Sequence, residues 1–194
     1  MIKSWVSVGN EEAAKNAEAI LAAMEELNKA GDEESKPDDI SYNSCINAWS
    51  LCGNPEGAER ILRKMKSPNV VSYNSVLQAW VRSDLAETGE RVIELLDEME
   101  SKVHVDNVIE PDHVTYNMCI KGLLRFKYDL DSIKLAEKLL GKAESIAKGK
   151  GTKLNISIYG SIIHACRKCD NAEAAYIANR GKLSSSIFFP RALE

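Results

Sequence analysis

Apolar residues recur along this chain at spacings of three and four positions, in pairs of stretches separated by polar turns. That spacing places apolar side chains on one face of a helix. The first stretch of each pair contains a tyrosine, as at Tyr73, and a second stretch follows it. The second stretches are residues 59–65, 90–99, 133–147 and 172–178. The pattern predicts an all-helical chain built from helix pairs.

The tyrosine-bearing stretches are copies of one another. They are residues 41–46, 72–77, 115–120 and 158–163, with Tyr42, Tyr73, Tyr116 and Tyr159 at the second position. A further copy without its front lies within residues 2–21, so we expect the chain to be a piece of a longer array. One helix pair cannot bury both apolar faces alone, whereas stacked pairs share a continuous core. The expected fold is all-α: an α-α solenoid, a right-handed superhelix of paired antiparallel helices.

Turn-forming residues mark the boundaries between the pairs. They are Pro37-Asp38, Pro68-Asn69, Pro111-Asp112 and, without the proline, Leu154-Asn155. Proline disfavours helix in the residue before it, and the Asp or Asn that follows, or the Ser or Thr before the tyrosine, can cap the next helix. The predicted units are a truncated first repeat (1–38), repeats 39–69, 70–112 and 113–155, a partial repeat (156–181) and a tail (182–194).

Aligning the units separates core positions from one polar face. The third position after each tyrosine is small and apolar, so Cys45 and Cys119 are interpreted as core residues. Packing likewise accounts for Trp49 and Trp80, seven positions after the tyrosine. The first, fifth and ninth positions after the tyrosine are polar in most units, and they share one helix face. These are Asn43, Asn74, Asn117 and Gly160; then Asn47, Gln78, Lys121 and His164, with Lys3 in the truncated copy; then Leu51, Arg82, Arg125 and Lys168.

Two interpretations of the asparagine column stay open from the residues alone. Asparagine is a mediocre helix former, so its return in three units favours a role beyond filling a solvated face. The alternative is the ordinary preference for Asn as a cap near a helix start.

Charge is distributed unevenly along the chain, although the net charge is only −4. Residues 1–112 contain 22 acidic and 11 basic residues, whereas residues 113–194 contain 7 and 14. Such asymmetry indicates a polyanionic partner for the basic half, or simply helix faces that are charged for solubility. Five cysteines without a pairing pattern favour free thiols, and Cys166 with Cys169 lacks the second ligand pair of a zinc site. No apolar run is long enough to cross a bilayer.

These repeats resemble the pentatricopeptide repeat family. The resemblance rests on residues 71–77 and 113–117, on Gly53 at the end of a first helix, on Glu98-Met99 and on Pro111-Asp112, and it extends to about residue 181. It implies sequence-specific binding of single-stranded RNA at one base per repeat. It also implies a mitochondrial or plastid protein that serves RNA processing, stability or translation.

The family pattern assigns a base-reading pair to each repeat: the residue after the tyrosine and the last residue of that repeat. The pairs are Asn43 with Asn69, Asn74 with Asp112, and Asn117 with Asn155. In the family, Asn with Asp is associated with uracil, and Asn with Asn with cytosine or pyrimidines generally. The residues expected to sandwich the bases are Ile40, Val71 and Val114, and those expected to contact phosphates are Arg82, Lys121, Arg125 and Lys168. Gly160 and Ser157 depart from the pattern, so the predicted target is pyrimidine-uracil-pyrimidine.

Other function classes are less well supported. A tetratricopeptide-type protein scaffold is the main alternative, but its Trp, Leu-Gly, Tyr and Ala-x-x-x-Phe signature is not matched. The acidic N-terminal half, including Glu25, Glu26 and Asp32, is a possible surface for a protein partner. We find no glycine-rich phosphate loop, two-histidine metal pair or carboxylate cluster, so no enzyme, cofactor or metal site is expected.

Overall fold

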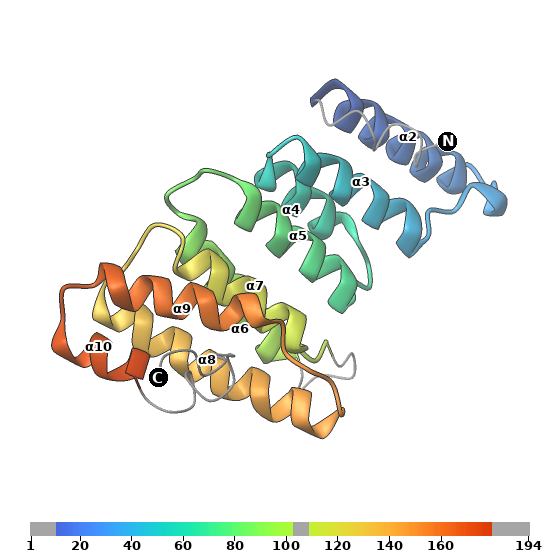
Figure 1. Cartoon of the computed structure of the whole chain (residues 1–194). Coiled ribbons are helices and arrows are strands. Elements are labelled where there is room, and N and C mark those ends of the chain that lie inside the picture. The colour runs from blue at the N-terminus through green and yellow to red at the C-terminus, as the bar shows by residue number, and fades with distance from the viewer. Residues whose placement is uncertain (1–10, 103–108, 180–194) are drawn as a thin grey trace. The chain divides into compact units, whose positions relative to one another are not determined.

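The computed structural model describes residues 11–102 and 109–179, and all the regular structure in these two ranges is helical (Figure 1). The predicted all-α fold of paired helices is confirmed. The chain forms two compact units, Met1–Pro111 and Asp112–Glu194. The predicted partial copy around Trp5, the residue Lys3 and the tail 182–194 lie outside the described residues.

The first unit consists of consecutive helices that pack against their neighbours. They are α2 (Glu11–Lys29), the 3-10 turn η1 (Glu33–Ser35), α3 (Asp39–Leu51), α4 (Pro55–Lys64), α5 (Val70–Arg82) and α6 (Thr88–Lys102). Helix α3 packs against α2, α4 and α5, and α5 also packs against α4 and α6. The tyrosine-bearing helices α3 and α5 are therefore direct neighbours.

Turn chemistry positions α4 against α3. Gly53 has φ +75°, a left-handed conformation that glycine adopts without steric cost, and it turns the chain after α3. Asn54 then caps α4, whose first residue is Pro55. A Cβ on Gly57 would lie 2.6 Å from Cδ2 of Trp49, so this glycine is what lets the indole ring pack on α4.

The core columns behave as the alignment predicts. Cys45, Val76, Cys119 and Ile162, three positions after the tyrosines, are fully buried. Burial raises the pKa of the Cys45 thiol to about 12, which keeps it protonated and unreactive at neutral pH. The cysteines of this column are therefore packing residues, as predicted.

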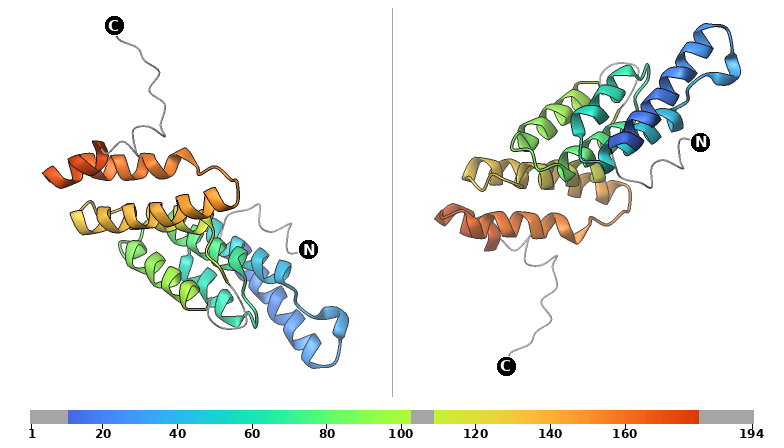
Figure 2. Two further views of the ribbon diagram at one scale, coloured as in Figure 1. Left: turned by 90° about the horizontal axis from the view of Figure 1, so that it is seen from below. Right: turned by 90° about the horizontal axis from the view of Figure 1, so that it is seen from above.

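The second unit repeats the same helix-pair arrangement. Its helices are α7 (His113–Leu123), α8 (Leu130–Gly149), α9 (Ile156–Lys168) and α10 (Ala172–Asn179). Helix α7 packs against α8 and α9, and α10 packs against both α8 and α9 (Figure 2). Asp129 caps α8, and Gly151, with φ +63°, turns the chain after it.

Two general features of the described residues bear on function. Neither range contains a helix whose length and apolar character would suit a membrane span. Within the same residues, no group of three or more His, Cys, Asp or Glu side chains is arranged to hold a metal ion. Cys166 is buried in α9, and Cys169 is the C-cap residue that follows the end of this helix.

Candidate nucleic-acid interface

The first turn of every tyrosine-bearing helix is closed by the residue that the sequence assigns as the last of the preceding repeat. Asp38 Oδ1 accepts from the Ser41 N–H at 2.8 Å, and Asn69 Oδ1 accepts from the Ser72 N–H at 3.0 Å. The corresponding bonds of Asp112 and Asn155 measure 2.8 and 2.9 Å, from Thr115 and Ser157 respectively. These four residues are helix N-caps, as predicted.

Capping fixes the orientation of these side chains before any ligand arrives. The hydroxyls of Ser41, Ser72 and Thr115 also donate to the capping oxygen. In Asp38, the hydrogen bonds from the Ser41 hydroxyl and backbone lower the pKa of the carboxyl group, so it is ionised at neutral pH. One oxygen of each cap therefore faces the helix, and the rest of the side chain is held in a defined position.

An aliphatic residue follows each of the first three caps as the second residue of the helix, and it is exposed in α3 and α5. Ile40 is 60% exposed and Val71 is 61% exposed, each as the second residue of its helix, and Val114 is half-buried at the same position of α7. Large aliphatic side chains left in solvent at a repeated position can serve as a contact surface. At this position α9 has Ser157, although its first residue, Ile156, is 61% exposed.

The asparagines that follow the tyrosines are half-buried in the first and second units alike. Asn43 and Asn117 each have a buried side-chain oxygen without a hydrogen-bond partner among the described residues. A buried polar atom without a partner is uncommon in folded proteins and requires an explanation. Asn43 is the fifth residue of α3, whose cap is Asp38. The alternative interpretation of these asparagines as caps is therefore wrong.

The tyrosines fix the turn that bears these asparagines. Tyr42 donates to Glu25 at 2.8 Å, and Tyr73 donates to Glu98 at 2.7 Å. In α9, Tyr159 donates to Glu144 at 3.1 Å. Each ring is held by a carboxylate of a neighbouring second helix, so the residue after the tyrosine has a fixed direction.

The predicted phosphate-contacting residues lie toward the other end of the same helices. Arg82 and Lys168 are exposed and are the last residues of α5 and α9. Lys121, within α7, and Arg125, just beyond it, are half-buried.

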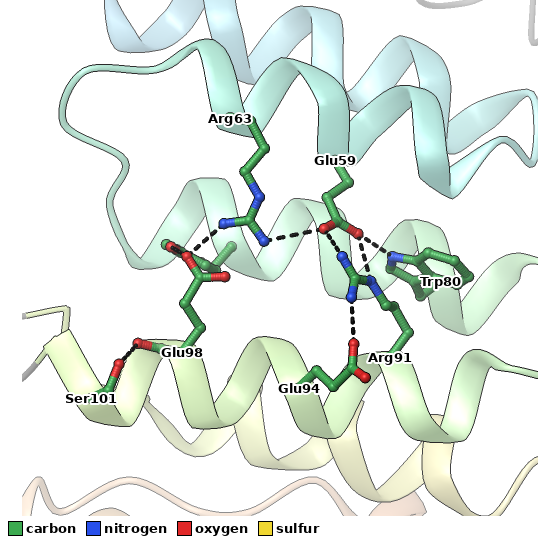
Figure 3. A network of polar contacts seen from close by, with 8 residues as sticks. Glu59, Arg63, Trp80, Arg91, Glu94, Glu98 and Ser101 are labelled. Atoms are coloured by element: carbon green, nitrogen blue, oxygen red, sulfur yellow. Dashed lines mark hydrogen bonds and ion pairs between the residues drawn. The ribbon is translucent and has the colours of Figure 1, made fainter.

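A network of ionic hydrogen bonds between successive repeats was not foreseen from the sequence (Figure 3). The Glu59 carboxylate of α4 accepts from Trp80 Nε1 at 3.2 Å, from Arg91 Nε at 3.1 Å and from Arg63 Nη2 at 3.1 Å. Burial alone would raise the pKa of Glu59, but these donors, chiefly Arg91, outweigh it and lower the pKa. The network joins α4, α5 and α6.

The same arrangement occurs one repeat earlier. Trp49 Nε1 donates to Glu18 of α2 at 3.1 Å, and Arg60 Nη2 donates to the same carboxylate oxygen at 2.7 Å. Packing is thus only part of the role of the tryptophans. A buried indole N–H needs an acceptor, and an arginine stands eleven positions after both Trp49 and Trp80. Those two signals together could have revealed the network.

A cleft of about 380 Å³ opens next to the start of α3. Its lining includes Asp39 and Tyr42 of α3 together with Lys36, Lys64 and Lys66. The cleft is thus lined partly by lysines and lies beside the capped turn.

Two family descriptions match this chain. The PPR repeat family matches residues 68–125, and the pentatricopeptide repeat domain matches residues 27–83. The chain belongs to the pentatricopeptide repeat family. This assignment selects the pentatricopeptide interpretation over the tetratricopeptide alternative, and a comparison with curated proteins found no match. Pentatricopeptide repeat proteins are helical repeat proteins that typically bind RNA, are generally not catalytic and are typically organellar.

Proposed function

We propose that this pentatricopeptide repeat chain binds single-stranded RNA selectively, at about one base per repeat and with a preference for pyrimidines. The observation that supports it best is the repeated first turn: a capping Asp or Asn, an aliphatic residue that is exposed or half-buried, and a half-buried Asn after the tyrosine. We propose Asn43 with Asn69, Asn74 with Asp112, and Asn117 with Asn155 as the base-reading pairs.

The chemistry of these side chains suits pyrimidines. Ionised Asp only accepts hydrogen bonds, which suits the N3–H donor of uracil, whereas the Asn amide donates to the bare N3 of cytosine. Ile40, Val71 and Val114 would contact the faces of the bases, as stacking surfaces do in other single-strand binders. Asn43 and Asn117 each have a buried amide oxygen without a hydrogen-bond partner among the described residues, which supports a role beyond packing.

Cations at the far end of the same helices would supply affinity without sequence information. Arg82, Lys121, Arg125 and Lys168 are proposed to contact phosphates. A mitochondrial or plastid location, with a role in RNA processing, stability or translation, is proposed from family membership alone. As a secondary proposal, the acidic residues among the first 112 positions contact a protein partner.

Fluorescence anisotropy with short labelled RNAs tests the proposal. Pyrimidine-rich RNA should bind more tightly than purine-rich RNA of equal length, and both affinities should fall as salt rises. Because an array of this size is expected to bind weakly, the comparison between sequences is more informative than the absolute affinity. Equal and salt-insensitive binding of all RNAs, or no binding at millimolar RNA, would contradict it.

A further inference from the structure

The carboxylate of Asp39 holds the amide of Asn69 across two neighbouring helices. Asn69 Nδ2 donates to Asp39 Oδ2 at 2.9 Å, which joins the cap of α5 to the first residue of α3. Asp39 is exposed, and its other oxygen has no hydrogen-bond partner among the described residues. Asp39 also precedes Asn43 by four positions, so the two side chains share a face of α3. Asp39, Asn43 and Asn69 therefore form one cluster.

The hydrogen bonds around Asn69 occupy its amide oxygen, so that the side chain can offer a ligand only an N–H donor. Its oxygen accepts from the Ser72 N–H at 3.0 Å and from the Ser72 hydroxyl at 3.1 Å. One amide hydrogen is directed at Asp39, and the other remains for a ligand. A flipped amide would lose the cap and bring its oxygen against the Asp39 carboxylate. The carboxylate thus locks the amide in one orientation.

We propose that Asp39 is a specificity-determining residue that makes the repeat 39–69 select cytosine over uracil; this inference rests on the proposed function. The Asn69 amide donor and the Asp39 carboxylate acceptor lie side by side. Cytosine presents a matching pair of neighbouring groups, the N3 acceptor and the N4 amino donor. Uracil presents the opposite pair, because its N3–H would face the amide hydrogen and its O4 would face the carboxylate.

Among the other tyrosine-bearing helices that the structure describes, none has an acid at the position of Asp39. The equivalent first helical residues are Val70, His113 and Ile156. The repeat 113–155 has the same Asn-Asn pair, Asn117 with Asn155, but His113 in place of Asp39. It therefore provides an internal comparison, in which the pair is expected to accept either pyrimidine.

The test uses the full chain and a single-stranded RNA pool with three adjacent randomised nucleotides flanked by adenosines. Retained RNA is sequenced, and the ratio of cytosine to uracil is measured at each position. Asp39→Val should lower this ratio about fivefold at one of the two positions beside the uracil position, the loss expected for one hydrogen bond. Asp39→Asn, which keeps an acceptor without the charge, should give an intermediate ratio.

His113→Asp is the matched gain-of-function variant. It should raise the ratio of cytosine to uracil at the nucleotide on the opposite side of the central uracil position from the one affected by Asp39→Val. The two variants together then show which outer nucleotide is bound by the repeat 39–69 and which by the repeat 113–155. Thermal unfolding monitored by circular dichroism checks that the variants are folded, since Asp39 is exposed and valine stands at the same place in α5.

The outcomes separate this inference from the proposed function. If the native chain retains no RNA, the proposed function fails. If RNA is retained but Asp39→Val leaves every ratio unchanged, or alters all three positions equally, the role of Asp39 is overturned while RNA binding stands. A change confined to one position, mirrored by His113→Asp at the other, supports it.

Discussion

Asp112 combines a structural bond with a proposed role in reading a base. Its Oδ1 accepts from the Thr115 N–H at 2.8 Å and from the Thr115 hydroxyl at 2.9 Å. Asparagine is as favourable an N-cap as aspartate. Exchanging one for the other therefore changes the groups offered to a base while keeping the first turn of α7 closed.

We predict that Asn74→Ser combined with Asp112→Asn shifts the base preference away from uracil at one position only. The carboxylate acceptor for the uracil N3–H is removed, whereas the other base-reading pairs are untouched. The measurement is the base frequency at each position of RNA retained from a randomised pool. Asp129→Ala is the control, because Asp129 caps α8 with a 2.8 Å bond and belongs to no proposed base-reading pair. It should cost about 1 kcal/mol of stability and leave the base frequencies unchanged.

A second residue-scale prediction concerns Val71, which is 61% exposed. Val71→Ala should change the free energy of unfolding by no more than about 0.5 kcal/mol, as for most surface substitutions. It should nevertheless weaken RNA binding several-fold if the side chain contacts the face of a base. Val76→Ala is the contrasting variant, because Val76 is fully buried and its truncation should destabilise the fold. Unchanged RNA affinity in Val71→Ala would remove Val71 from the interface.

At the scale of the helices, local signals in the sequence were sufficient to predict the helices and their caps but not the contacts between helices. The caps Asp38 and Asn69 were predictable because a cap bonds within its own first turn. The Glu59 network was not, because its partners Trp80 and Arg91 come from two later helices, 21 and 32 positions away. Only the packing of α4 against α5, and of α5 against α6, brings these groups together. The Asp39–Asn69 bond escaped prediction for the same reason.

We predict that Glu59→Ala destabilises the first unit by about 3 kcal/mol, because it leaves the Trp80 indole and the arginines without a buried acceptor. The loss is no larger because Arg63 keeps its 2.5 Å hydrogen bond to Glu98 when Glu59 is removed. Urea unfolding followed by tryptophan fluorescence measures it, since Trp49 and Trp80 both lie in helices of this unit. Glu94→Ala, which removes an exposed carboxylate, should cost at most about 1 kcal/mol.

Acid should weaken the same network. The pKa of Glu59 is lower in the folded chain than its ordinary value of 4.5. Its contribution to stability is therefore fully present above pH 4.5 and is lost as the pH falls through the lowered pKa. The urea concentration at the unfolding midpoint should fall as the pH is lowered below 4.5. The midpoint of Glu59→Gln should fall less, because glutamine has no proton to take up. Parallel pH profiles for the two proteins would exclude Glu59 as the source.

At the scale of the whole chain, opposite charges predominate in the two halves. Residues 1–112 contain twice as many acidic as basic residues, whereas residues 113–194 contain twice as many basic as acidic ones. A polyanion such as RNA is therefore attracted mainly to the second half, while the proposed base-reading pairs extend over both. The expected consequence is that affinity depends most on cations of the second half, and base selection on residues of both.

Salt dependence separates these contributions. For single strands the slope of log K against log salt is about −0.7 for each phosphate neutralised, so the four proposed contacts predict a slope near −3. Lys168→Gln should make the slope less steep by about 0.7 without altering base preference. Lys134→Gln is the matched control, because Lys134 lies on α8, in the same unit, and is paired with Glu173 at 3.0 Å. Equal changes in slope for the two variants would indicate general charge attraction. A change for Lys168 alone would place a phosphate at the end of α9. General charge attraction would affect both lysines of this unit, whereas a direct phosphate contact affects only the lysine that makes it.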